Sequence, residues 1–164
     1  MRPSNNKIHK KITATYLTQK PRKDSFWTAM ILLGLLLLIN FLAWQWPSLE
    51  MSKFLSSRQT ALYDQETWRL ITSPLLHSDF KHLSSNLLML TPLTFLIYGY
   101  HGMSSLLTLF LPITWLTQYL TLIGMPENVS LLGSSGTAYA MCAFWLVLYG
   151  FIDRRRTVAK RLFP

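Results

Sequence analysis

Four long apolar runs divide this sequence and constrain its fold more than any other feature. They cover residues 26–46, 83–100, 104–124 and 135–152, and each is close to the roughly 20 residues that an α-helix needs to cross the hydrocarbon of a bilayer. Half of the 164 residues are hydrophobic, a composition typical of membrane proteins rather than of soluble domains. We therefore predict an all-α, polytopic, multi-pass membrane protein with four transmembrane helices.

Basic residues gather at the two ends of the chain, beside the first and last apolar runs. Residues 1–25 carry seven Lys or Arg and one acid, and residues 153–164 carry five Lys or Arg and one acid. The positive-inside rule explains this placement and puts both ends in the cytoplasm, next to anionic lipid headgroups. The net charge of +9 therefore gives no reason to expect nucleic acid as a partner.

These observations divide the chain into three parts. Residues 1–25 form a basic cytoplasmic arm, residues 26–152 the transmembrane domain and residues 153–164 a basic cytoplasmic tail. With both ends inside, the long 47–82 connection between the first two spans lies outside. Its mixture of apolar and charged residues predicts a structured loop that lies partly in the membrane interface.

Polar side chains with potential chemistry stand at the start of the second apolar run. His82 and Asn86 are four residues apart, so on a helix they share one face, and both could donate hydrogen bonds to a developing oxyanion. His77 lies five residues before His82, in the predicted turn that leads into this helix. The same side chains could instead bond neighbouring helices or water, as polar groups in membrane bundles commonly do.

A second polar feature, Gly133-Ser134-Ser135-Gly136, opens the fourth apolar run. A serine at a helix start lies among unpaired backbone N–H groups, and Gly136 leaves room for the backbone of a substrate. Tyr139 follows Ser135 by four residues, on the same helix face. In the alternative interpretation the serines cap the helix and the glycines allow close helix packing.

The sequence predicts neither a metal nor a cofactor. No His, Cys, Asp or Glu cluster has the spacing of metal ligands. Cys142 is the single cysteine, so the chain has no internal disulfide.

In this order the motifs resemble those of the rhomboid intramembrane serine proteases. Trp68-Arg69 resembles the Trp-Arg motif of their first outer loop, and residues 77–86 resemble their His-x4-His-x3-Asn motif. Residues 133–136 resemble their Gly-x-Ser-Gly nucleophile motif, with Tyr139 at the family's aromatic position. The resemblance covers the predicted transmembrane domain and implies a helical bundle similar to the N-terminal part of the six-helix rhomboid core.

The resemblance also implies an activity and a set of roles. The activity is hydrolysis of peptide bonds in the transmembrane segments of membrane-protein substrates. Ser135 would be the nucleophile, and His82, Asn86 and the Ser135 backbone N–H would form the oxyanion hole. The implied supporting residues are His77 in the hydrogen-bond network, Gly133 and Gly136 in the turn, Tyr139 against the catalytic imidazole, and Trp68 and Arg69 in the outer loop.

The sequence departs from the family in its general base, which in the family is a histidine two helices after the serine. Here no histidine follows His101. Without a base a serine hydroxyl is a weak nucleophile, and removing the histidine of a soluble serine protease costs roughly a million-fold in turnover. We therefore expect a chain of this sequence to be catalytically silent or nearly so.

Three interpretations follow from the missing base. The chain is a C-terminally incomplete rhomboid protease, a rhomboid-like pseudoprotease that binds transmembrane segments without cutting them, or an unrelated four-span protein whose polar groups join helices. A second departure lies at the end of the second run, where the family's Gly-x3-Glu-x3-Gly pattern reads Thr94, Tyr98 and Gly102. It places the packing of this helix end in question.

Overall fold

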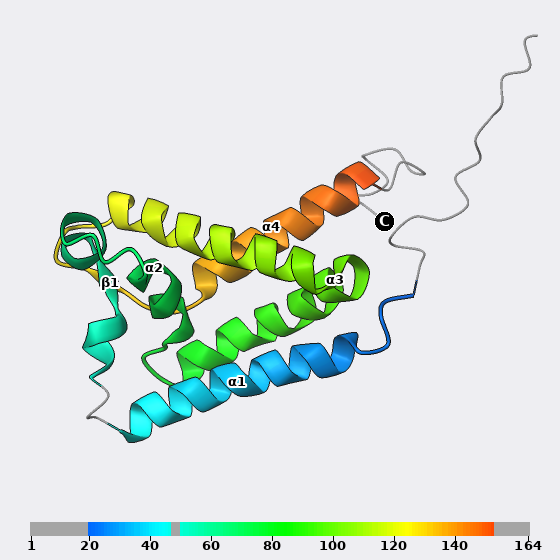
Figure 1. Cartoon of the computed structure of the whole chain (residues 1–164), viewed down its shortest axis with the longest axis horizontal. Helices are drawn as coiled ribbons and strands as arrows, with labels where there is room; N and C mark the ends of the chain where they lie inside the picture. The colour runs from blue at the N-terminus through cyan, green and yellow to red at the C-terminus, as the bar shows by residue number, and fades with distance from the viewer. Residues whose placement is uncertain (1–19, 47–49, 153–164) are drawn as a thin grey trace, which may run out of the picture.

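A computed structural model describes residues 20–46 and 50–152, and this part of the chain is mostly helical. In Figure 1, α1 (Ser25–Gln45) lies beside the first half of α3 (Phe80–Gly124), and α4 (Ser135–Ile152) packs against α3. By length and composition α1 and α3 could each cross a membrane, and Ser135–Leu148 of α4 is a shorter apolar helix. The structure thus agrees with a mostly helical membrane protein.

Helix α3 is a hairpin rather than a single rod. A straight helix of 45 residues would be roughly 70 Å long, more than twice the hydrocarbon thickness of about 30 Å. Gly102 has φ 83° and ψ 177°, a backbone conformation that favours glycine, and the chain reverses there (Figure 1). The two segments, 80–101 and 103–124, hold the second and third predicted apolar runs, and each tolerates an internal proline, Pro92 and Pro112.

The segment that leads into α1 contacts the end of this hairpin at which the chain reverses. The Arg22 backbone N–H donates to the Gly99 carbonyl at 3.0 Å, and the Arg22 guanidinium lies 5.8 Å from the centre of the Tyr98 ring. The Tyr98 hydroxyl donates to the Asp24 carboxylate. A Cβ at Gly99 would lie 2.9 Å from Ser25 Oγ, so glycine permits this close approach. Where the family has a glutamate, Tyr98 therefore meets a carboxylate supplied by the N-terminal segment.

The connection between α1 and α3 is folded. It contains a 3-10 helix Met51–Phe54, β1 (Ser56–Ser57), a π-helix Arg58–Tyr63, α2 (Arg69–Thr72) and a 3-10 helix Ser73–Leu75. Strand β1 pairs antiparallel with β2 (Ser130–Leu131), which lies just before α4. Arg58 Nε also donates to the Leu122 carbonyl at 2.7 Å. The loop is thus attached to both ends of the segment that joins α3 to α4.

Arg69 holds this loop together from within. Its Nε donates to Glu66 at 2.5 Å, and its Nη1 donates to the carbonyls of Lys53 and, at 3.3 Å, Leu55. The guanidinium lies 4.8 Å from the centre of the Trp68 ring. Because the Arg69 side chain is only 11 % exposed, these contacts are less screened by water than a surface ion pair. Trp68 and Arg69 therefore join the start of α2 to the 3-10 helix at 51–54.

Candidate active site

His77 lies fully buried in the turn that leads into α3. Its backbone N–H donates to Asn40 Oδ1 at 2.7 Å, and its carbonyl accepts from Trp44 Nε1 at 2.9 Å. Its ring Nε2 is 3.4 Å from the Ser134 backbone N and 3.3 Å from Ser134 Oγ. A backbone N–H can only donate, so Nε2 accepts and the ring proton belongs on Nδ1. Within the described residues, that Nδ1 has no hydrogen-bond partner.

The environment of His77 keeps its ring neutral. Burial, together with the smaller effect of the neighbouring His82, lowers the pKa of His77 to about 4. The two rings meet edge to face, with centroids 5.0 Å apart. At neutral pH His77 is therefore an uncharged hydrogen-bond acceptor for the turn before α4.

Asp79 fixes the first turn of α3 and with it His82. Asp79 Oδ1 accepts from the His82 backbone N–H at 2.8 Å, and Oδ2 accepts from Ser78 Oγ at 2.8 Å. The first of these bonds, followed by the second, holds the pKa of Asp79 below its usual value. This is the N-cap geometry preferred by aspartate, and Ser78 Oγ also lies 3.4 Å from His82 Nδ1.

Gly133 is the point at which the α3 and α4 sides of the site meet. Its φ of 96° lies in the region that favours glycine. A Cβ there would lie 2.6 Å from His82 Cε1, 2.7 Å from His82 Nε2 and 3.6 Å from Asn86 Nδ2. Its N–H donates to the Ser73 carbonyl at 3.2 Å, and its carbonyl accepts from Gln118 Nε2 at 3.4 Å. The absence of a side chain thus lets His82 and Asn86 approach the turn backbone.

Asn86 lies on α3, and Ser135 and Tyr139 lie on α4, the helix that follows this turn. Asn86 is 6 % exposed, and its Nδ2 lacks a hydrogen-bond partner in the part of the chain that the structure describes. A buried unpaired donor is costly and is often explained by an ordered water or ligand. Ser135 is the first residue of α4 and is partly buried, whereas Tyr139, one turn later, is 66 % exposed. The ring of His77 bonds to Ser134, and no hydrogen bond joins His77 or His82 to the Ser135 hydroxyl.

Helix α4 packs against α3 through small and polar side chains. Thr137 Oγ1 donates to Thr114 Oγ1 at 3.1 Å in a buried contact. Gly136 faces Thr117, whose side chain would lie 3.4 Å from an added Cβ. Gln118, one turn after Thr114, reaches the turn carbonyl described above. Small and hydrogen-bonding residues are typical of helix contacts within membranes, and here they orient the start of α4.

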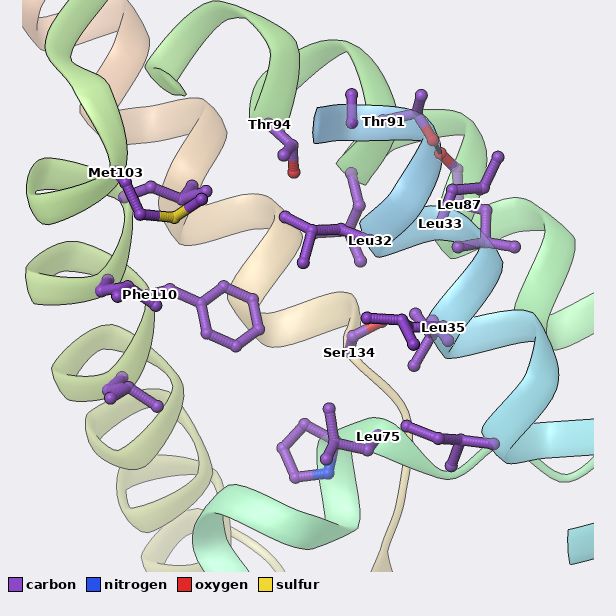
Figure 2. Close-up of a pocket in the computed structure, with 18 residues that line it drawn as sticks. Leu32, Leu33, Leu35, Leu75, Leu87, Thr91, Thr94, Met103, Phe110 and Ser134 are labelled. Carbon is purple, nitrogen blue, oxygen red and sulfur yellow. Dashed lines mark hydrogen bonds between the residues drawn. The ribbon is translucent and has the colours of Figure 1, made fainter. Parts of the chain in front are cut away.

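An apolar cavity of about 320 Å³ borders the turn, between α1 and the two segments of α3. In Figure 2, Leu32 and Leu35 of α1 lie across the cavity from Met103 and Phe110 of α3, and Ser134 stands on its wall. Cavities with apolar walls generally stay dry. The contact between His77 and Ser134 is therefore shielded from water on this side.

The site combines a serine at a helix start with the buried amide of Asn86, the buried ring of His77 and the partly buried ring of His82. Within the described ranges no group of three or more His, Cys, Asp or Glu side chains could hold a metal ion. Serine hydroxyls beside preorganised donors are the equipment of acyl-transfer enzymes, and here they lie in a bundle of apolar helices. The structure thus places a serine at the start of an apolar helix, with buried polar side chains close to the turn that precedes it.

The comparison with protein families identifies the chain more closely. The rhomboid domain model matches residues 64–162, well over half of the sequence, and the chain belongs to the rhomboid family. The match begins in the connection between α1 and α3 and includes α2, α3, β2 and α4, whereas α1 precedes it. The searches of curated proteins and of solved structures returned no match.

Four residues of the site were not assigned to it from the sequence. Asn40 and Trp44 on α1 form hydrogen bonds with the backbone of His77. Ser134 bonds to the His77 ring, and Gln118 donates to the Gly133 carbonyl. Asn40 and Gln118 carried a visible signal, because each is a polar residue inside an apolar run and such residues are costly. The partners of these two residues could not be predicted, since the contacts join segments 15 to 37 residues apart.

Proposed function

We propose that this chain provides the nucleophile and oxyanion-binding side of a rhomboid-type intramembrane serine endopeptidase site. Ser135 acts as nucleophile, and His82, Asn86 and the Ser135 N–H stabilise the oxyanion. The observation that carries the proposal is the close approach at Gly133, where His82 and Asn86 lie against the turn that precedes Ser135. Among the residues that the structure describes, Asn86 Nδ2 has no hydrogen-bond partner. Rhomboid membership adds that the substrates are membrane-embedded.

The proposed chemistry defines what the site can supply. Ser135 Oγ would attack the scissile carbonyl carbon, and the carbonyl electron pair would move onto its oxygen, where the buried donors receive it. The proton of Oγ needs an acceptor at the same moment. His77 already accepts from Ser134, which favours as a second candidate function a pseudoprotease that binds transmembrane segments without cutting them.

The membrane arrangement is part of the same proposal. We place α1, the two segments of α3, and α4 across the bilayer as four spans with both chain termini in the cytoplasm. The reversal of α3 at Gly102 and the apolar composition of all four segments support it. The basic terminal segments would then lie beside anionic headgroups, although both lie mainly outside the described residues.

Photocrosslinking tests the site through Tyr139, which is 66 % exposed one turn after Ser135. With p-benzoylphenylalanine at position 139, we expect saturable capture of a synthetic single-span peptide in vesicles, because Tyr139 borders the proposed substrate position. The matched control carries the same photoreactive residue at position 38 of α1, where Leu38 is 51 % exposed. Equal, non-saturable capture at both positions would contradict the proposal, and peptide products in the same samples would separate protease from pseudoprotease.

A further inference from the structure

Helix α1 lies outside the segment matched by the rhomboid model, yet it contacts the candidate site directly. Asn40 is completely buried in the C-terminal part of this apolar helix, five residues before its end. Its Nδ2 donates to the Leu36 carbonyl in its own helix and to the Leu75 carbonyl, each at 2.9 Å. Its Oδ1 accepts from the His77 N–H at 2.7 Å. One amide thus fixes the turn before α3 at two points.

Trp44 adds a third point of attachment. It follows Asn40 by one helical turn, so the two side chains leave the same face of α1. Its indole N–H donates to the His77 carbonyl at 2.9 Å. Both backbone polar groups of His77 are therefore held by side chains of α1, and because His77 is fully buried water cannot readily replace them.

The contacts continue from His77 to the start of α4. The His77 ring accepts from the N–H and the hydroxyl of Ser134. The Ser134 carbonyl in turn accepts the first α4 hydrogen bond, from the Ala138 N–H at 2.9 Å. Ser135 is the next residue, so any rotation of the His77 backbone would move the turn that carries it.

We propose that Asn40, assisted by Trp44, is a positioning residue of the site: it sets the place of His77 and, through Ser134, the orientation of Ser135. The catalytic consequence rests on the proposed function. The placement of His77 itself does not, so it can be tested without any activity. A buried asparagine with a purely structural role could form all its hydrogen bonds within its own helix. Asn40 instead forms two of its three described hydrogen bonds with the 75–77 turn.

Chemical modification of histidines by diethyl pyrocarbonate tests the placement, because the reagent acylates accessible neutral imidazoles. His77 is fully buried, and the partly buried His82 provides an internal reference in the same protein. In micelles at pH 7, we expect Asn40→Leu to raise modification of His77 relative to His82 by about tenfold or more, since a buried hydrogen-bond network is broken. Mass spectrometry of the digested protein separates the two sites.

Three further variants make the result specific. Asn40→Asp, which as a neutral acid keeps an oxygen for the His77 N–H, should restore most of the protection. Thr91→Val removes a hydroxyl that bonds only within α3, to the Leu87 carbonyl at 2.7 Å, and should leave the ratio at the parent value. Trp44→Phe removes one donor but keeps an aromatic ring, and should raise the ratio severalfold.

The proposal is overturned if Asn40→Leu retains the parent's helical content and unfolding midpoint while His77 stays as protected as in the parent. If Asn40→Leu does not fold, Trp44→Phe decides: an unchanged ratio in the folded variant overturns the proposal and a raised ratio supports it. Lack of Ser135 reactivity in all variants, with His77 deprotected as expected, would instead count against the proposed function alone.

Discussion

Replacing Gly133 with alanine is expected to destabilise the protein by about 2–6 kcal/mol, because two costs add. A residue with a Cβ is strained at φ 96°, which costs on the order of 1–3 kcal/mol. The new Cβ would also lie 2.6 Å from His82 Cε1, and such overpacking costs about 1–3 kcal/mol. Reversible denaturant unfolding in detergent micelles measures the sum.

Gly34→Ala provides the matched control for this substitution. Gly34 lies inside α1, and an added Cβ there would meet nothing within 4 Å. Alanine should stabilise such a helical position by about 0.5–1 kcal/mol, since glycine loses more backbone entropy on folding. The two glycine substitutions should therefore move the free energy of unfolding in opposite directions. A Gly133→Ala protein as stable as the parent would show that the turn does not lie against His82.

The second large effect is a loss of stability in mild acid. The pKa of His77 is lowered to about 4 in the folded protein from an ordinary value of 6.5. Between about pH 6.5 and pH 4, His77 is protonated in the unfolded chain but neutral in the folded protein. The free energy of unfolding therefore decreases as the pH falls, and the loss is complete below about pH 4. At pH 5 we expect the free energy of unfolding to be about 2 kcal/mol lower than at pH 7.5, since one pKa unit corresponds to about 1.4 kcal/mol.

His77→Gln separates this contribution from those of other groups. The pKa of Asp79 is depressed, and its contribution is lost only at still lower pH. The glutamine keeps an acceptor for Ser134 but does not titrate, and its unfolding should depend less on pH between 7.5 and 5. Equal pH dependence in the parent and His77→Gln would show that His77 is not buried as a neutral ring.

The helices were predicted well from the sequence because the length of each apolar run indicates the length of the helix that it forms. Residues 26–46 became α1, Ser25–Gln45, almost without change. The second run was placed three residues late, since Asp79 caps α3 and draws Phe80, Lys81 and His82 into the helix. The strands β1 and β2 were not foreseen, because two-residue strands carry no periodic signal.

The candidate site was only partly accessible to sequence reasoning. The spacing of His82 and Asn86 correctly put them on one helix face, and both lie near Gly133. That Ser134 rather than Ser135 would bond to His77 depends on how α3 and α4 pack, which no local pattern encodes. The contribution of Asn40 was hidden for the same reason, since its partners lie 35 and 37 residues away.

The central claim is that Ser135 is a nucleophile held beside preformed oxyanion donors, and a fluorophosphonate probe tests it most directly. Ser135 Oγ would attack phosphorus and fluoride would leave, with the serine proton passing to a base. Imidazole added to the buffer can supply that base. We predict background labelling without imidazole, labelling of Ser135 that rises with imidazole concentration, and its loss in Ser135→Ala but not in Ser134→Ala. Equal labelling of the parent and Ser135→Ala at every imidazole concentration would contradict the claim.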